Sequence, residues 1–169
     1  MANPYLIRPM AHDDLPLVRG WRAQAHVARW WGDASIEPED EKLSDPRIAL
    51  WIAELDGQPF AFIQDYDVHG WSPHPFSYLP APSRGMDVYI GEAAMIGAGH
   101  GARFIRQHVG SLFAAGVKGV GIDPHPDNAA ARASFAKAGF KDVRGPVTTP
   151  WGVAMLMDRW AGDLAGDVG

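Results

Sequence analysis

The chain of 169 residues contains no cysteine. This absence excludes disulfide bonds, thiolate nucleophiles and zinc sites built on sulfur ligands. The seven histidines show neither a His-x-x-x-His pair nor a carboxylate partner at ligand spacing. We therefore expect no metal ion in the chemistry of this protein.

Positive charge is also scarce, with 15 lysines and arginines against 20 aspartates and glutamates and a formal net charge of -5. A protein that binds phosphate backbones needs the opposite balance, so nucleic acid is not an expected partner. No apolar run approaches the roughly 20 residues of a membrane span, and the first ten residues lack the layout of a signal peptide. We expect a cytoplasmic location and no membrane partner.

Length and composition indicate one domain. A typical domain has about 150 residues, and 47% of this chain is apolar, which is enough to bury a core. We expect a single domain over residues 1–160. Residues 161–169 are small and polar, which predicts a flexible C-terminal tail.

Hydrophobic periodicity, glycine and proline predict the order of elements. A strand comes first, then two helices and a hairpin, and the second half alternates strands with helices before two closing strands. The Asp56-Gly57 pair between apolar runs is typical of a hairpin turn. The strands are expected near residues 6–7, 48–55, 60–66, 86–90, 117–122, 143 and 153–157, and the helices near residues 15–21, 26–31, 102–115 and 128–138.

Two segments are expected to lie outside this regular framework. Residues 33–45 hold six acidic side chains against Lys42, which predicts a solvated, mobile segment or an ordinary acidic surface helix. Residues 67–84 hold four prolines, two histidines and several aromatics, a composition that excludes a helix or an interior strand. Loops of this length are commonly functional or disordered.

Three glycines, Gly97, Gly99 and Gly101, stand between an expected strand and an expected helix. Backbone N–H groups at a helix start bind phosphate or pyrophosphate, and the helix dipole adds to the attraction. Alternatively, the glycines let the helix pack tightly against a strand. The loop lacks the Lys-Ser or Lys-Thr pair of a Walker loop and the third glycine of a dinucleotide fingerprint, so neither nucleotide class is favoured.

The segment from Ile96 to Gly101 resembles the acyl-CoA pyrophosphate loop of the GNAT N-acetyltransferases, although Ile96 replaces the usual Arg or Gln. Other segments extend the resemblance to the aminoglycoside 6'-N-acetyltransferase branch of this family, over residues 6–159. These segments are Trp30-Trp31-Gly32, Gly85-Met86-Asp87, Ile122-Asp123-Pro124-His125-Pro126-Asp127-Asn128, Ala136-Lys137-Ala138-Gly139-Phe140 and Val147-Thr148-Thr149-Pro150.

The resemblance implies an α/β (α+β) fold of the GNAT type. Its mixed, mostly antiparallel central sheet would have about seven strands with helices on both faces. A splayed central strand pair, near residues 86–90 and 118–122, would admit the pantetheine arm of acetyl-CoA, the implied cofactor. The residues that the resemblance assigns to cofactor binding are Val88, Tyr89, Ile90, Gly97, Ala98, Gly99, His100, Gly101, Ala102, Asn128 and Phe135.

The resemblance assigns catalysis to Asp87. An alkyl amine must lose a proton before it attacks a thioester, because its pKa lies about 3 units above neutrality. An ordinary aspartate is a poor base, so Asp87 would need a pKa raised by desolvation, or would act as an anion that steers the amine and relays through water. In a further alternative, Asp87 only closes a turn after Gly85. Backbone N–H groups of residues 88–90 could polarise the thioester carbonyl.

The usual proton donor of the family is absent from this chain. Family members commonly carry a tyrosine before the Lys-Ala-Gly-Phe segment, where this chain has Phe135. Ser134 or Tyr89 could substitute, and otherwise water supplies the proton to the leaving thiolate. Because the thiolate is a good leaving group, loss of a side-chain acid need not abolish activity.

The acceptor is expected to be a primary amine of a small molecule, bound by Trp30, Trp31, Asp87 and Trp151. Trp151 stands where the aminoglycoside enzymes typically carry an aspartate that meets a ring ammonium. An aromatic face, which suits a cation or a sugar face, thus replaces a carboxylate. The tryptophans, Trp71 included, could equally be buried packing residues.

The sequence therefore predicts an acetyl-CoA-dependent N-acetyltransferase similar to the aminoglycoside 6'-N-acetyltransferases, acting as a monomer or homodimer. Two other functions stay open. The departures at Phe135 and Trp151 permit a non-catalytic acyl-CoA-binding or sensing module. Acetylation of a siderophore precursor or of a protein amine is the other.

Overall fold

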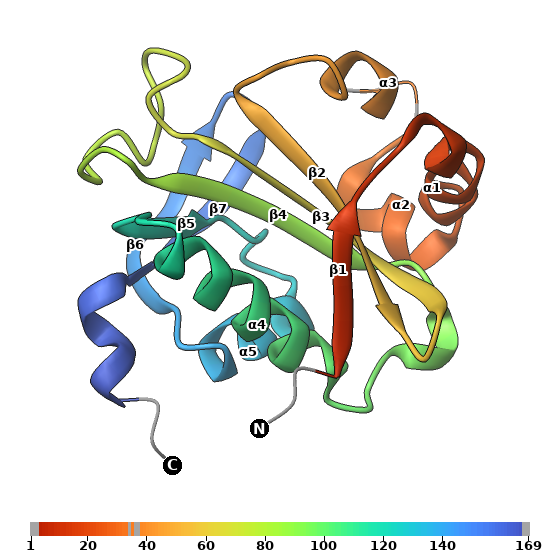
Figure 1. Ribbon diagram of the computed structural model, residues 1–169. Coiled ribbons are helices and arrows are strands. Elements are labelled where there is room, and N and C mark those ends of the chain that lie inside the picture. Colours follow the sequence, from red (N-terminus) through yellow and green to blue (C-terminus); the bar gives the residue numbers. More distant parts are fainter. Residues whose placement is uncertain (1–3, 34, 36–37, 167–169) are drawn as a thin grey trace. The chain divides into compact units, whose positions relative to one another are not determined.

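The computed structural model describes residues 4–33, 35 and 38–166. Its strands are β1 (Tyr5–Pro9), β2 (Ile48–Leu55), β3 (Gln58–Asp67), β4 (Arg84–Ile90), β5 (Gly119–Ile122), β6 (Lys141–Thr149) and β7 (Gly152–Trp160). They form one seven-stranded sheet in the order β1-β2-β3-β4-β5-β7-β6. β4 and β5 pair in parallel, whereas β1 with β2, β5 with β7 and β6 with β7 pair antiparallel. The expected mixed sheet of an α/β fold is confirmed (Figure 1).

Two compact units divide the chain. Unit 1 comprises Met1–Asp65 and Asp87–His100, and unit 2 comprises Tyr66–Met86 and Gly101–Gly169. Within unit 2, β4 joins β5 by pairing Arg84 with Val120 and Gly85 with Gly121. The splay between these strands beyond those pairs stays a prediction.

Unit 1 holds the two helices that the N-terminal sequence predicts, α1 (Leu15–Arg22) and α2 (Ala25–Trp31). It also holds α3 (Glu39–Lys42), within the acidic segment, and two short helices that the sequence does not predict, η1 (His12–Asp14) and, after β4, η2 (Ala93–Met95). Figure 1 shows α1 and α2 side by side, and their residues Val18, Trp21 and Val27 are buried together with Ile52 of β2. α2 ends at Trp31 and is followed by Gly32, whose φ of 73° lies in the left-handed region that favours glycine.

The hairpin of β2 and β3 forms as the sequence predicts. Asp56 and Gly57 adopt φ angles of 51° and 78°. Two consecutive left-handed residues give the turn whose twist matches that of antiparallel strands, and an Asp-Gly pair adopts it readily.

The acidic segment of residues 33–45 differs from expectation at Glu39, which is 2% exposed. Its Oε1 accepts a hydrogen bond of 2.9 Å from Nη1 of Arg22, which is buried to the same extent. Arg22 also donates to the backbone oxygen of Asp33 at 2.8 Å. A buried carboxylate needs such a partner because desolvating an unpaired charge is costly. The predicted solvation is therefore wrong for Glu39, while residues 34, 36 and 37 lie outside the described residues.

Unit 2 contains the second half of the predicted pattern. Its helices are α4 (His100–Ala114), whose first residue belongs to unit 1, α5 (Ala129–Lys137) and η3 (Ala161–Gly166). Gly116 and Gly139 follow α4 and α5 with φ angles of 99° and 98°, as expected for glycines that end helices. Of the tail that the sequence predicts to be flexible, residues 161–166 form η3 and residues 167–169 lie outside the described residues.

Residues 68–83 form the predicted loop, which Figure 1 shows as irregular lobes between β3 and β4. The loop packs against the sheet through buried side chains, including Phe76. A Cβ atom at Gly121 would lie 2.5 Å from the Phe76 ring, and one at Gly85 would lie 2.3 Å from the Tyr66 ring. These two glycines therefore allow aromatic rings to approach the strands of unit 2.

Candidate active site

The glycine loop places two residues in the left-handed region just before α4. Gly97 and Gly99 adopt φ angles of 82° and 84°, and α4 begins at His100. A Cβ atom at either glycine would meet no heavy atom within 4 Å, so close packing does not explain these glycines, whereas their left-handed backbone does. The alternative of glycines required for tight helix packing is thus disfavoured at both positions.

The electrostatics of this loop suit a diphosphate. α4 has 15 residues and no acidic side chain in its first turn. The unpaired N–H groups of such a turn favour an anion. We therefore still expect the backbone N–H groups of residues 97–102 to hold the pyrophosphate of acetyl-CoA, and this contact stays a prediction. These predicted contacts need no side chain from Ile96, which is 49% exposed.

His100 ties the end of the loop to β1. Its Nδ1 lies 2.8 Å from the hydroxyl of Tyr5, and the two rings meet edge to face with centroids 5.9 Å apart. The imidazole is thus engaged within unit 1. Any contact of His100 with the cofactor is therefore expected from its backbone N–H, and it stays a prediction.

Asp87 lies half-buried on β4 and accepts one of two linked side-chain hydrogen bonds. Nε2 of Gln64, on β3, donates to Oδ2 of Asp87 at 2.7 Å. Nζ of Lys42, on α3, donates to Oε1 of the same Gln64 at 3.0 Å. Our sequence reasoning missed both donors. A signal was present, because Gln64 is a polar residue within the apolar run of residues 60–66.

Tyr89 packs in the core of unit 1. Its ring lies 4.9 Å from that of Trp31 and 5.2 Å from that of Phe62. The hydroxyl is buried and makes no hydrogen bond among the described residues. Burial raises the pKa of Tyr89, and the negative charge of Glu39 adds to this effect. A raised pKa makes Tyr89 a weaker acid, which counts against its use as the proton donor.

The other predicted residues of unit 1 have separate neighbours. Trp30 lies under the guanidinium of Arg29, which is 4.7 Å from its ring centroid. The carbonyl of Ile90 accepts a hydrogen bond of 3.0 Å from Nε2 of His26, which therefore carries the proton. Val88 lies half-buried between Asp87 and Tyr89 on β4. Of the predicted aromatic residues of unit 1, the structure thus brings Trp31 and Tyr89 together.

Two of the predicted cofactor residues of unit 2, Asn128 and Phe135, lie at the start of α5 and within it. The Oδ1 of Asn128 accepts a hydrogen bond of 3.2 Å from the backbone N of Ala131, so Asn128 caps α5. Phe135 is buried, with its ring 6.3 Å from that of Phe140. Gly101 and Ala102 belong to the first turn of α4. Cofactor contacts of these four residues stay predictions.

Trp151 pairs with a carboxylate that our sequence reasoning did not assign to the site. Its Nε1 donates to Oδ2 of Asp123 at 2.5 Å, and the indole is 49% exposed. The ring of His74 lies 5.6 Å from Trp151 and 5.4 Å from Tyr66, which in turn lies 5.9 Å from Trp71. Burial lowers the pKa of His74, with a contribution from a neighbouring histidine, so this ring tends to be neutral. Unit 2 therefore presents an aromatic cluster with one anchored carboxylate.

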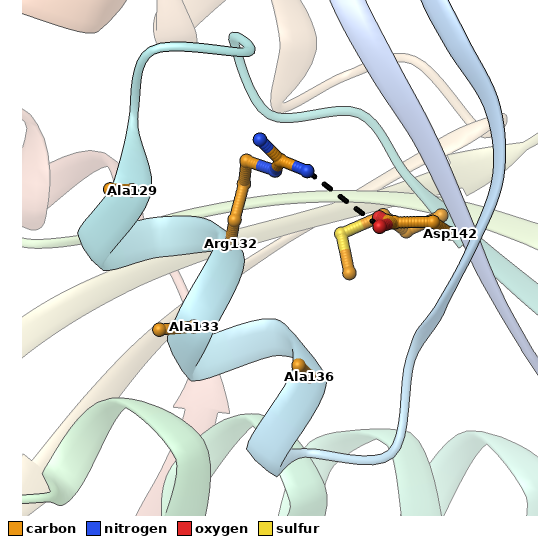
Figure 2. A pocket seen from close by; sticks show the side chains of 6 residues that line it. Ala129, Arg132, Ala133, Ala136 and Asp142 are labelled. Atoms are coloured by element: carbon orange, nitrogen blue, oxygen red, sulfur yellow. Dashed lines mark ion pairs between the residues drawn. The ribbon is translucent and has the colours of Figure 1, made fainter.

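A hollow of about 280 Å³ lies elsewhere in unit 2, and Figure 2 shows Arg132 extending from α5 beside it. A guanidinium nitrogen of Arg132 lies 3.6 Å from Oδ2 of Asp142. The residues that line the hollow are Ala129, Arg132, Ala133, Ala136, Asp142 and Met157. None of them is a predicted site residue, so this hollow adds nothing to the candidate active site. Among the described residues, no group of three or more histidines and carboxylates is placed to hold a metal ion.

Comparisons with known proteins identify the family of this chain. A family model described as an acetyltransferase (GNAT) domain matches residues 10–146. The chain is 30% identical over 162 residues to aminoglycoside N(6')-acetyltransferase type 1 of Klebsiella pneumoniae, covering 89% of this chain and 80% of the relative. The protein of the same name from Serratia marcescens matches equally well.

A solved structure similar to this chain is that of AAC(6')-Ib in complex with paromomycin and acetyl-CoA. It has a TM-score of 0.86 and 28% identity, and the match covers 98% of both chains. No helix among the described residues is both long and apolar enough to cross a membrane. Since the family model spans most of the chain and both units, the chain belongs to the GNAT acetyltransferase family and is an acetyl-CoA-dependent acyltransferase.

Proposed function

We propose that this protein transfers the acetyl group of acetyl-CoA to a primary amine of an aminoglycoside or a closely similar amino sugar. The observation that carries this proposal is the carboxylate of Asp87, held on β4 by the 2.7 Å hydrogen bond from Gln64. The relatives named aminoglycoside N(6')-acetyltransferase support the choice of acceptor.

Asp87 acts on the acceptor in the proposed mechanism. An alkyl ammonium carries a full positive charge near neutral pH, and its nitrogen becomes a nucleophile only after a proton leaves. A fixed carboxylate attracts the ammonium, orients its nitrogen and passes the released proton to water. Acetyl-CoA, when bound, supplies an activated thioester carbonyl. The N–H groups of residues 88–90 are the candidates to polarise that carbonyl.

The chain has few side chains that could donate a proton to the leaving thiolate. Phe135 has no proton to give, and burial raises the pKa of Tyr89 above the ordinary range of a phenol. Ser134 remains a candidate, and water is the simplest donor. A thiol has a reference pKa of about 8.5, so general acid assistance is worth less here than for an alkoxide.

The aromatic cluster of unit 2 is the proposed binding surface for a ring of the acceptor. The exposed indole of Trp151 offers a flat face for a sugar or an ammonium group, and Asp123 adds a carboxylate beside it. This combination suits a polyamine built on rings better than a peptide. The cytoplasmic location and the monomeric or homodimeric state stay predictions.

The test is a thiol-release assay with acetyl-CoA and a panel of amines. The panel contains aminoglycosides, linear polyamines, hydroxylysine derivatives as siderophore precursors, and peptides. We expect the highest kcat/KM with an aminoglycoside. A higher kcat/KM with hydroxylysine derivatives or peptides overturns the proposed acceptor. Acetyl-CoA binding by calorimetry without release for any amine indicates the sensing module instead.

A further inference from the structure

We propose that Gln64 and Lys42 are positioning residues that hold Asp87 as an oriented anion during amine acetylation. This role rests on the proposed function, because it concerns the chemistry of Asp87. It favours one of the two catalytic roles open to that carboxylate, because an anion that steers the amine needs donors around it. A base with a raised pKa needs an apolar surrounding instead.

The chemistry of Lys42, Gln64 and Asp87 fixes the direction of the hydrogen bonds between them. An ammonium group has donors and no acceptor, an ionised carboxylate has acceptors and no donor, and an amide has both. With Lys42 at its oxygen and Asp87 at its nitrogen, the Gln64 amide satisfies both neighbours. The opposite orientation would face oxygen with oxygen and N–H with N–H. Lys42 therefore fixes Gln64 as a donor toward Asp87.

Burial makes this direction strict. Gln64 is 7% exposed on β3, so water competes weakly for its amide group. A buried amide that loses a partner pays the full cost of desolvation, which disfavours a rotated side chain. The donor distance of 2.7 Å to Asp87 lies in the range of hydrogen bonds to ionised acceptors. The positive charge of Lys42 thus acts on Asp87 through a polarised amide.

The same sheet contains a matched interaction for comparison. Nε1 of Trp51, on β2, donates to Oδ2 of Asp65 at 2.7 Å. Asp65 follows Gln64 directly on β3 and is also buried. Neighbouring residues of a strand point to opposite faces of the sheet. The bond between Trp51 and Asp65 therefore lies on the other face from the bond between Gln64 and Asp87. Trp51→Phe therefore removes an equally short hydrogen bond to a carboxylate without touching Asp87.

Steady-state kinetics with the best amine test the positioning role. Gln64→Leu removes the donor, and we expect kcat to fall about tenfold to a hundredfold with an unchanged KM for acetyl-CoA. Lys42→Met should lower kcat about threefold to tenfold, and Lys42→Arg should restore it. Trp51→Phe should leave kcat within about twofold of wild type. Equal kcat in wild type and both loss variants, or an equal fall in Trp51→Phe, overturns the proposal.

A double variant shows whether Lys42 acts on Asp87 through Gln64 or independently of it. If Lys42 acts through Gln64, then Lys42→Met costs nothing further in a Gln64→Leu background. Additive losses show that Lys42 acts by another route and overturn its part. Lys42 is only half-buried, so its variants keep the test usable if Gln64→Leu fails to fold.

A measurement without substrate separates this proposal from the proposed function. The side-chain N–H resonances of Gln64 can be assigned by NMR from their loss in Gln64→Glu. We expect these resonances to shift in both Asp87→Asn and Lys42→Met, and to stay unchanged in Trp51→Phe. Shifts without any thiol release in wild type would refute the proposed function and support the hydrogen-bonded chain. Unchanged resonances in Asp87→Asn and Lys42→Met refute the linked hydrogen bonds of Lys42, Gln64 and Asp87.

Discussion

Each unit contains a candidate-site aspartate, Asp87 or Asp123, that accepts a short hydrogen bond from a side-chain nitrogen, but the two donors differ in kind. Asp87 in unit 1 receives its bond from the buried amide of Gln64, which Lys42 orients. Asp123 in unit 2 receives its bond from Trp151, whose indole is 49% exposed. A buried donor with a cation behind it cannot turn away, whereas an exposed indole can.

We expect the two carboxylates to differ in role for this reason. A group that takes part in the transfer must keep its orientation, because small misplacements reduce the rate strongly. A group that recognises the acceptor gains from a partner that adapts to different rings. We therefore expect substitutions around Asp87 to change kcat and substitutions around Asp123 to change the KM for the acceptor.

The largest expected effect comes from neutralising the two carboxylates in turn. Asp87→Asn should lower kcat about a hundredfold to a thousandfold, because the ammonium loses the anion that orients it. Asp123→Asn keeps an oxygen for Trp151 and should change kcat less than about threefold. The KM for a cationic acceptor should rise in the second variant. Thiol-release kinetics measure both constants, and equal kcat losses in the two variants would remove the distinction.

The order of elements was predictable from the sequence because it depends on local signals. Asp56-Gly57, Gly116 and Gly139 mark ends and turns through backbone conformations that glycine adopts easily, and each one does so in the structure. The fate of Glu39 was not predictable in the same way. Its burial depends on Arg22, a residue 17 positions away that only the folded chain brings within 2.9 Å.

The candidate site divides along the same line. The conformation of the glycine loop was predictable, because it depends on the backbone and glycines stand at positions 97 and 99, where the φ angles are positive. Gln64 lies 23 residues from Asp87, and Trp151 lies 28 residues from Asp123. Such pairs depend on which strands and loops become neighbours. Periodicity and spacing carry no information about that, although a polar residue in an apolar strand is a usable hint.

A second prediction separates the binding of the acetyl donor, acetyl-CoA, from the roles of the two carboxylates. Gly99→Ala places a side chain in the left-handed region at φ 84°, next to the N–H groups proposed to hold the pyrophosphate. We expect the KM for acetyl-CoA to rise about tenfold, with a loss of stability of about 1 kcal/mol.

Gly57→Ala is the matched control for this variant, because Gly57 has a φ of 78° and equally open space around its Cβ position. It should cost similar stability, read as the midpoint of thermal unfolding, and leave the KM for acetyl-CoA unchanged. The same rise in KM in both variants would trace the effect to stability rather than to the loop.

A third prediction tests whether the indole limits the choice of acceptor. Trp151→Asp replaces an aromatic donor with a second carboxylate near Asp123. Two carboxylates attract an acceptor with several ammonium groups, so we expect kcat/KM for an aminoglycoside to rise about fivefold at low ionic strength. The rise should shrink as salt is added. A fall in kcat/KM at all salt concentrations would show that the aromatic face contributes more to binding than charge does.

The smallest expected effect concerns the single hydrogen bond between Trp151 and Asp123. Trp151→Phe keeps an aromatic face and removes the N–H donor, so we expect the KM for the acceptor to rise about twofold to threefold with kcat unchanged. Trp71→Phe trims another exposed indole of the same cluster, one whose ring lies 5.9 Å from Tyr66. If only Trp151→Phe raises the KM, the acceptor is recognised by the carboxylate of Asp123 that Trp151 holds. If both variants raise the KM equally, the acceptor binds to the aromatic surface. The contrast between Asp87 and Asp123 then holds for catalysis but not for recognition.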